Sequence, residues 1–358
     1  MTICSEAPRD MDLLLRGFLA IRQKEIIELE IAFFDHASVA SGRNSPWCTN
    51  NFMSRSVIWF HKDPSQGNQV CLYCGIDVGS GSSVISNEEH LIGRNFVPKG
   101  TMENHFNFSF RACEECNNRK SKLEDHISSL TLLDTPSIAT NQLARSAAER
   151  KANGSFHPEK RVRMKDARER EEFEFSFGGA TFKFGMTGPP RPAEDYIPRL
   201  AYHHVQGLFS LVSTPEGDPE AQLRILPPDQ FRFFGHYVHS DWGNTQLNEI
   251  TQRVANVPCV AAIISGAGHF RACLRCSPGG GWFWALEWNK SLRLVGAIQH
   301  PSVSCSWFED LPRLDWRSLP DGSRIRTEVA EPDLGASLFP LGLVPPPDDE
   351  DFVQSAFS

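Results

Sequence analysis

Two Cys-x-x-Cys pairs constrain the fold of this chain more than any other feature of its sequence. The first pair is Cys71 and Cys74, and the second is Cys113 and Cys116. The two-residue spacing lets both thiolates of a pair face one point, so two pairs a few tens of residues apart can surround a single zinc ion with four sulfurs. The sequence therefore predicts a structural zinc site with these four ligands, and the alternative is four buried free thiols.

The residues between and after the two pairs predict a strand, a second strand and a helix. Residues 83–86 contain adjacent β-branched side chains and lead into Glu89 and His90, and residues 107–112 alternate apolar and polar side chains. Apolar residues then recur at three- and four-residue steps, with Asn117 as the expected N-cap of a helix. Because adjacent strand residues point to opposite faces, Glu89 and His90 can serve one site only if the chain bends at His90.

In this order the elements resemble the HNH nucleases of the ββα-metal superfamily, in the subset braced by a four-cysteine zinc site. The resemblance rests on the two cysteine pairs, on Glu89 and His90, and on the sequence Cys-x-x-Cys-Asn-x-x-Lys that ends at Lys120. It leaves most of the 358 residues uncovered. It implies that His90 is the general base and that Glu89 and Asn117 hold a catalytic Mg²⁺ or Mn²⁺, separate from the structural zinc.

The family also has a middle Asn that holds the catalytic His by a hydrogen bond. This Asn usually stands five residues before the third cysteine, a position that is Phe108 here. Asn107 is one residue away, and a one-residue bulge would restore its place in the strand. The resemblance therefore implies Asn107 as the orienting catalytic residue, with Asn104 as a second candidate.

The chemistry of phosphodiester hydrolysis independently suits these residue types. The reaction needs a water that is deprotonated near neutral pH, and histidine has the unperturbed pKa for that task. It also needs positive charge beside the phosphate, which a hard cation on carboxylate and amide oxygens supplies. The alternative for Glu89 and His90 is a surface dipeptide, or an inactive site on an intact zinc scaffold.

Binding to nucleic acid has to come from local basic patches, because the net charge of the whole chain is -8. Residues 145–170 contain nine Lys or Arg against four acidic residues. Such a run is usually a solvated helix face, but beside a nuclease helix it could lie along a phosphate backbone. The predicted nucleic-acid contacts are Arg119, Lys120, Lys160 and Arg161.

The remaining chain predicts an α+β fold. A hairpin of alternating phenylalanines is expected over residues 173–185, a helix over 197–212, and a mainly antiparallel sheet with flanking helices over 231–300. The predicted parts are a helical N-terminal segment (1–60), a zinc-braced HNH module (61–135), a basic helical linker (136–172), a C-terminal α+β domain (173–300) and a loosely attached, Pro-rich acidic tail (301–358).

Several histidines and cysteines outside this pattern are expected to have structural roles. We expect His126 on a solvated helix face, and His203 and His204 as structural histidines of one helix. Cys273 and Cys276 form a third Cys-x-x-Cys, but they lie in an alternating strand, where positions i and i+3 point to opposite faces. A second zinc site is therefore not expected.

Sequence signals for location and partners favour a cytoplasmic protein without a membrane partner. No run approaches the ~20 apolar residues of a membrane span, the N-terminus lacks a basic and then apolar signal pattern, and the scattered cysteines fit a reducing compartment. The expected function is a metal-dependent endonuclease acting on DNA, expected to be double-stranded, in a setting such as restriction or phage defence. Cutting both strands would favour a homodimer. The alternative is a non-catalytic zinc scaffold that binds nucleic acid or protein.

Overall fold

The computed structural model describes most of the chain between residues 58 and 339. The described residues are 58–59, 65–66, 68–102, 107–133, 142–167, 169–177, 180–188, 192–193, 195–213, 224–239, 243–277, 280–300, 305–313, 316–318, 324–326 and 331–339. The helical N-terminal segment expected over residues 1–60 lies outside them, apart from residues 58–59.

The segment with the four cysteines forms a small sheet followed by a long helix. The sheet has the order β2 (Ser65–Gln66), β4 (Ser109–Cys113), β3 (Ser86–His90), with β2 parallel and β3 antiparallel to β4. Helix α2 (Glu114–Thr131) follows β4 without a loop. The predicted order of strand, strand and helix is thus present, although the first strand starts at residue 86 instead of residue 83.

Helix α2 also begins four residues earlier than predicted. Cys113 is its N-cap, with extended backbone angles, and Asn117 lies inside the first turns of the helix. Two acidic residues, Glu114 and Glu115, occupy the first turn, where the unpaired N–H groups and the helix dipole favour negative charge. The acidic pair therefore marks the helix start better than the asparagine does.

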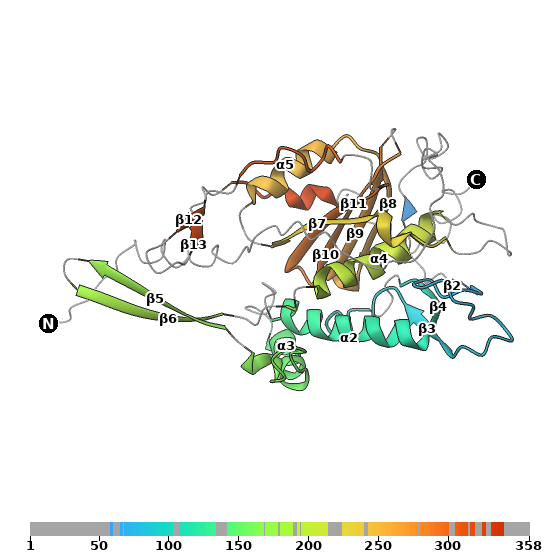
Figure 1. Ribbon diagram of the computed structural model, residues 1–358, viewed down its shortest axis with the longest axis horizontal. Helices are drawn as coiled ribbons and strands as arrows, with labels where there is room; N and C mark the ends of the chain where they lie inside the picture. Colours follow the sequence, from blue (N-terminus) through green and yellow to red (C-terminus); the bar gives the residue numbers. More distant parts are fainter. Residues whose placement is uncertain are drawn as a thin grey trace.

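A second, six-stranded sheet forms the centre of the molecule (Figure 1). Its strand order is β1 (Ile58–Trp59), β8 (Cys259–Ser265), β9 (Phe270–Cys276), β10 (Trp282–Trp288), β11 (Leu292–Ile298) and β7 (Phe231–Val238). All neighbouring pairs are antiparallel except β1 and β8, which are parallel. Residues 58–59 therefore form an edge strand of this sheet.

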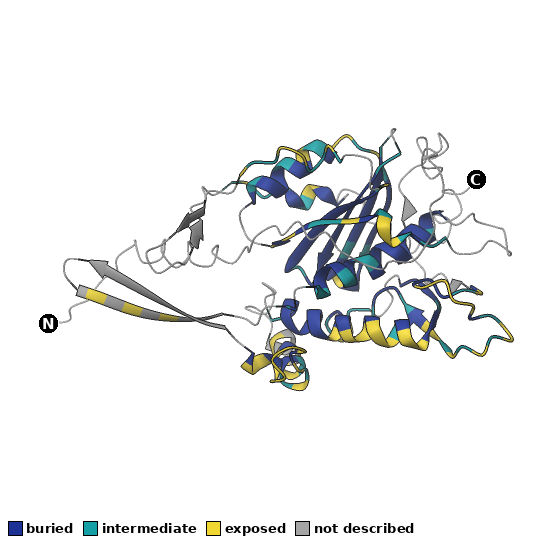
Figure 2. Cartoon of the chain, viewed as in Figure 1, coloured by how far each residue is buried: buried dark blue, intermediate teal, exposed yellow. Residues whose placement is uncertain are grey.

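Helices cover both faces of the six-stranded sheet. Helix α4 (Tyr196–Ser213) lies on one face and α5 (Thr245–Val254) on the other, and every residue of β10 and β11 is buried between them (Figure 2). Strands buried on both faces carry near-continuous apolar side chains, which explains the run from Trp282 to Trp288. The fold is α+β, as the sequence predicts.

The cysteine-bearing segment and the six-stranded sheet share one hydrophobic core. Apolar side chains of the small sheet, α2, α4 and the inner face of the large sheet form a continuous cluster. Asn289, in the turn between β10 and β11, donates hydrogen bonds to the Phe96 carbonyl (3.0 Å) and to Oγ1 of Thr131 (2.8 Å). Helix α4 contacts both α2 and β7, so the helices link the large sheet to the cysteine-bearing segment.

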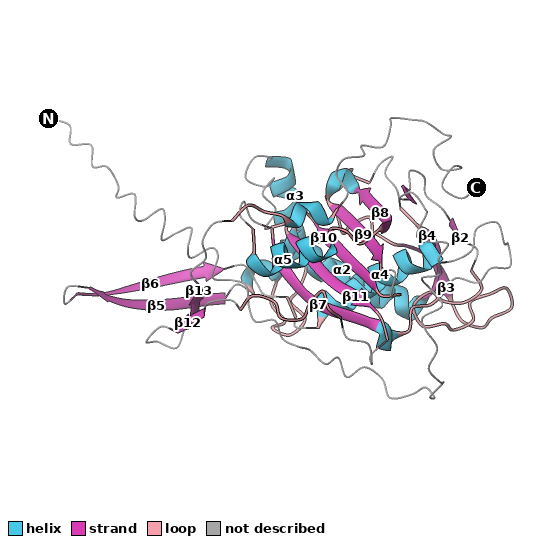
Figure 3. Ribbon diagram, turned by 90° about the horizontal axis from the view of Figure 1, so that it is seen from above, coloured by secondary structure: helices cyan, strands magenta, loops and turns pink. Residues whose placement is uncertain are grey.

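A long two-stranded hairpin projects away from this body. It consists of β5 (Glu169–Phe177) and β6 (Ala180–Gly188), and two views at right angles show it extending from the core (Figures 1 and 3). Its register pairs Phe173 with Phe184 and Phe175 with Phe182, as the alternating pattern predicts. Before it lie α3 (Gln142–Gly154) and a short 3-10 turn η3 (Met164–Asp166), so in the described part of the predicted helical linker the α-helix covers residues 142–154.

Residues 331–339 of the predicted C-terminal tail pack against the body of the protein. This part of the chain holds a small ribbon of β12 (Trp316–Ser318) and β13 (Arg324–Arg326) and the 3-10 turn η6 (Gly335–Leu338). Two other 3-10 turns, η4 (Pro228–Gln230) and η5 (Gly266–Gly268), precede β7 and β9 in the large sheet. Leu338 and Phe339 are buried in the cluster beneath α5. The prediction of a loosely attached tail is therefore wrong for residues 331–339, because two apolar side chains anchor them.

Candidate functional site

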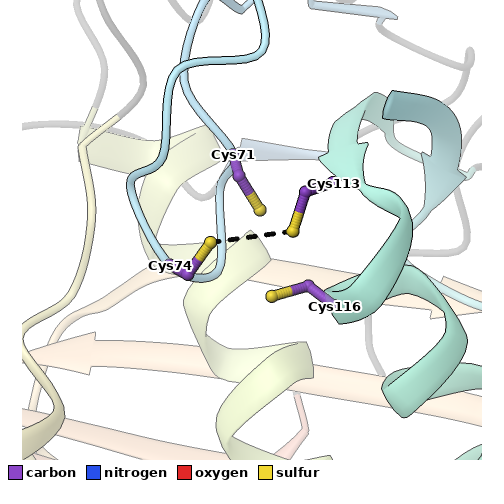
Figure 4. A group of neighbouring side chains, drawn as sticks. All are labelled: Cys71, Cys74, Cys113 and Cys116. Carbon is purple, nitrogen blue, oxygen red and sulfur yellow. Dashed lines mark hydrogen bonds between the residues drawn. The ribbon is translucent and has the colours of Figure 1, made fainter. Parts of the chain in front are cut away.

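The four predicted cysteines come together at one point. Their sulfur atoms all lie within 4.8 Å of one another, and the Sγ atoms of Cys74 and Cys113 are 3.7 Å apart (Figure 4). Four thiolates at about 2.3 Å from a tetrahedral zinc ion are separated by about 3.8 Å. The spacing thus fits a metal such as zinc, with Cys71, Cys113 and Cys116 buried and Cys74 exposed.

Local backbone geometry supplies the two halves of this cluster. A tight turn brings Cys71 and Cys74 together, with hydrogen bonds from the Cys71 N–H to the Ile76 carbonyl (2.7 Å) and from the Gly75 N–H to the Cys71 carbonyl (2.8 Å). Gly75 has a φ of 74°, a conformation that favours glycine. The thiols affect one another unequally: the hydrogen bond from Cys116 lowers the pKa of Cys71 to about 4, whereas burial raises the pKa of Cys74 and the contact with Cys71 raises the pKa of Cys116.

A pocket of about 140 Å³ lies beside the start of α2. Its lining includes Glu89 and His90 from β3 and Asn117 from α2, three of the residues predicted to act together. Strand β3 pairs regularly with β4 through His90, and the chain bends at Leu91, one residue later than predicted. Glu89 is buried and His90 is half-buried, so these adjacent side chains both reach the pocket wall.

Asn107 braces the turn that follows His90. Its Oδ1 accepts a hydrogen bond from the Ile92 N–H (3.0 Å), and its Nδ2 donates to the Ile92 carbonyl (2.8 Å). The side chain is buried, so these bonds are shielded from water. Asn107 therefore fixes the backbone two residues beyond His90. The second candidate, Asn104, lies outside the described residues.

The position of Lys120 differs from its prediction as a nucleic-acid contact. Its side chain is fully buried, and its Nζ donates to Oε1 of Glu89 (2.6 Å), to the His90 carbonyl (2.9 Å) and to Oε1 of Glu124 (2.7 Å). A phosphate cannot reach this ammonium. Lys120 lies on the inner face of α2 because the two carboxylates compensate for the loss of water around its charge.

Burial and ion pairing act in opposite directions on the pKa values of this buried group. Burial by itself lowers the pKa of Lys120, but the two carboxylates raise it more, so the ammonium stays charged. Burial by itself raises the pKa of Glu124, but Lys120 and His204 outweigh burial and hold this pKa at about 2. Burial also raises the pKa of Glu89, an effect that Lys120 opposes. Two carboxylates thus face one ammonium.

His204 brings helix α4 into the same group. Its Nε2 lies 3.4 Å from Oε1 of Glu124, and the side chain is fully buried. Burial lowers the pKa of His204 to about 4, so the ring is neutral at neutral pH. His204 is thus structural, as predicted, but it also touches the pocket wall. The sequence analysis missed Glu124, although its i+4 spacing from Lys120 was a signal for an ion pair. No local signal connects His204 to it, since 80 residues separate them.

His126 is also placed differently from its prediction. It was expected on a solvated helix face, but it is buried, and its Nε2 accepts a hydrogen bond from the Ala193 N–H (3.1 Å). Its ring packs edge-on against Tyr196 at 4.8 Å between centroids. Helix α4 begins at Tyr196 and covers this side of α2, which removes His126 from water.

The other basic residues predicted to bind nucleic acid remain exposed. Arg119 lies on the outer face of α2 and pairs with Glu115 (2.6 Å). Lys160 and Arg161 lie in the turn after α3, where the Lys160 Nζ donates to the Ala167 carbonyl (3.2 Å). Helix α3 itself meets the pocket, because Lys151 hydrogen-bonds the Asn95 carbonyl and lies 3.5 Å from Asp125. The exposed basic turn thus continues from an element that borders the pocket.

Comparison with protein-family models, with curated proteins and with solved structures finds no match to this chain. None of the helices in the described part of the chain combines the length and the apolar composition that crossing a membrane requires.

Proposed function

We propose that this protein is a metal-dependent endonuclease of the HNH type that hydrolyses DNA phosphodiester bonds. The observation that supports this most is the pocket that His90 shares with Glu89 and Asn117, the residue that follows Cys116 of the four-cysteine cluster in the chain. A base and two oxygen ligands on one small cavity are the groups that metal-assisted hydrolysis requires.

Each residue has a defined task in this proposal. His90 takes a proton from the attacking water, and the braced turn after it limits the movement of its backbone. A carboxylate oxygen of Glu89 and the amide oxygen of Asn117 would hold Mg²⁺ or Mn²⁺, which stabilises negative charge on the phosphate. Zinc on the four cysteines would be structural: it fixes the start of α2 and thereby the direction of Asn117.

The exposed basic turn after α3 would contact the phosphate backbone. Lys160, Arg161, Arg163 and Lys165 are exposed there, within a protein of net charge -8. Local positive charge beside a cutting site attracts a polyanion even against an unfavourable overall field. Double-stranded DNA is the proposed substrate, with two copies of the chain needed if both strands are cut in one event. A cytoplasmic role in restriction or phage defence would suit this activity.

A non-catalytic nucleic-acid- or protein-binding module is the second candidate, and one contact favours it. The ammonium of Lys120 lies 2.6 Å from Oε1 of Glu89. It therefore compensates part of the negative charge that would otherwise attract a metal cation. If the ion pair with Lys120 leaves Glu89 unable to bind a metal cation, Glu89 has a structural role only. Cation binding and cutting therefore separate the two candidates.

A nuclease assay with the zinc-loaded protein tests the proposal. The parent protein should cut plasmid DNA in the presence of Mg²⁺ or Mn²⁺ and not in their absence. His90→Ala should lower the rate by about 10²- to 10⁴-fold, the contribution of a positioned base, and should leave DNA affinity unchanged. His300→Ala removes an exposed histidine outside the pocket and serves as the control. Equal cutting by His90→Ala and the parent protein would rule out the proposed mechanism.

A further inference from the structure

The walls of the pocket are joined by a chain of buried polar contacts that crosses three elements. It runs from Glu89 on β3 through Lys120 and Glu124 on α2 to His204 on α4. We infer that Lys120, Glu124 and His204 are positioning residues, which fix Glu89 and the backbone around His90 in the arrangement that binds a divalent cation. This inference rests on the proposed function and extends it to residues that no sequence motif identifies.

The hydrogen bonds of Lys120 account for the position of both neighbouring pocket residues. An ammonium has three N–H donors, and the three acceptors within reach are the Glu89 carboxylate, the His90 carbonyl and the Glu124 carboxylate. One buried group therefore holds the side chain of Glu89 and the backbone of His90 at once. Because it engages Oε1 of Glu89, Oε2 is the oxygen that can face the pocket.

Glu124 connects this ammonium to the turn after β3. Its Oε1 accepts from Lys120 (2.7 Å) and from the Gly93 N–H (2.9 Å). The turn packs so closely on the carboxylate that a Cβ at Gly93 would lie 2.1 Å from Oε2 of Glu124. No other residue type fits at position 93 without moving one of the two. The carboxylate thus sets the position of the pocket-lining turn.

His204 anchors Glu124 to the rest of the protein. The imidazole packs edge-on against Phe96, Phe270 and Trp288, with centroids 5.1–5.5 Å apart, so its orientation is restricted on several sides. Phe270 and Trp288 belong to β9 and β10 of the large sheet. The large sheet and α4 therefore support the pocket mechanically, in addition to any role of their own.

The charge of the group points to a cation as its partner. Two acidic side chains, Glu89 and Glu124, share the single ammonium of Lys120, and both acidic side chains line the pocket. A buried excess charge is costly unless it is compensated. A divalent cation held by Glu89 and Asn117 would supply that compensation, and the groups that orient metal ligands commonly change metal affinity by 10- to 100-fold when they are removed.

Affinity for Mn²⁺, measured by calorimetry on the zinc-loaded full-length protein, tests this inference. Glu124→Gln keeps the size of the side chain and removes its charge, and it should weaken Mn²⁺ binding by about tenfold or more. His204→Gln should shift the affinity in the same direction by a smaller factor. Lys120→Met leaves two carboxylates unpaired and can prevent folding, so the other two variants carry the test.

Glu287→Gln is the matched control. Glu287 is a fully buried carboxylate of β10 that pairs with Arg293 at 2.8 Å, and it does not line the pocket. A merely structural role for Glu124 would make the two variants alike: both would lower the unfolding temperature and neither would change Mn²⁺ affinity. Mn²⁺ affinity of Glu124→Gln within twofold of the parent protein would overturn the inference, and so would a parent protein that binds no Mn²⁺.

A separate result would overturn the proposed function. If the parent protein binds Mn²⁺ and loses that binding in Glu89→Ala, but cuts no DNA, the endonuclease proposal fails. The comparison of Glu124→Gln with Glu287→Gln still decides whether the buried chain positions the cation ligand, because its readout does not depend on cutting.

Discussion

Replacing Lys120 by methionine should destabilise this protein strongly at neutral pH. Methionine has nearly the length of lysine, so the substitution removes the charge and the three hydrogen-bond donors and leaves little empty space. Glu89 and Glu124 then remain as buried carboxylates without a counter-ion. Breaking a buried ion pair by removing one partner costs about 3–5 kcal/mol. We expect the free energy of unfolding to fall by an amount in this range.

The loss should depend on pH in a direction that the structure sets. Without Lys120, burial is the largest remaining influence on both carboxyl groups, and it raises the pKa of each. A carboxyl group whose pKa is higher in the folded than in the unfolded protein binds its proton more tightly in the folded state. Lowering the pH therefore reduces the free-energy cost of burying it. The difference in stability between Lys120→Met and the parent protein should therefore shrink as the pH falls from 7 to 5.

Urea unfolding followed by tryptophan fluorescence measures both effects, because Trp282, Trp284 and Trp288 are buried in the shared core. Lys122→Met is the control: Lys122 is exposed on the same helix, and surface substitutions usually change stability by less than about 0.5 kcal/mol. A Lys120→Met variant within about 1 kcal/mol of the parent protein at pH 7, or equally destabilised at pH 7 and pH 5, would refute this account of the buried charges.

Three further predictions follow from the same structure. Zinc should be present in stoichiometric amount, and Cys71→Ser or a strong chelator should lower the unfolding temperature of the protein, because the ion joins the turn before β3 to the start of α2. Charge reversal of Lys160 and Arg161 should weaken DNA binding and reduce the slope of log affinity against log salt by about 2, one for each lost phosphate contact. Stability should also fall as the pH is lowered from about 6.5 to about 4. Burial lowers the pKa values of His126 and His204 to about 4, so between these pH values the unfolded chain binds protons that the folded chain does not.

One measurement can contradict each of these three predictions. Elemental analysis that finds no zinc would end the metal assignment of the cysteines. An unchanged salt slope after charge reversal would show that the basic turn is only a solvated surface. Unfolding free energies that are the same at pH 6.5 and pH 4.5 would show that the buried histidines take up protons in the folded protein, and His126→Gln should reduce the pH dependence if they do not.

The sequence by itself determined the features that depend on short-range geometry. The spacing within each Cys-x-x-Cys pair is a property of a few covalent bonds and a turn, so the convergence of Cys71 with Cys74 and of Cys113 with Cys116 could be predicted. The alternating phenylalanines around Phe175 likewise predicted a hairpin, since a strand has a two-residue period. The α+β class followed from the same periodicities.

Only the tertiary structure decided which polar residues lose contact with water. Lys120 follows a cluster of polar residues and was predicted to contact phosphate, yet α2 turns it inward, where β3 and Glu124 supply its partners. His204 approaches Glu124 across 80 residues of chain, because α4 packs against α2 beneath the large sheet. Periodicity shows which face of a helix is apolar, but it does not show which distant element covers that face. Packing alone makes one lysine a surface charge and another the buried partner of two carboxyl groups.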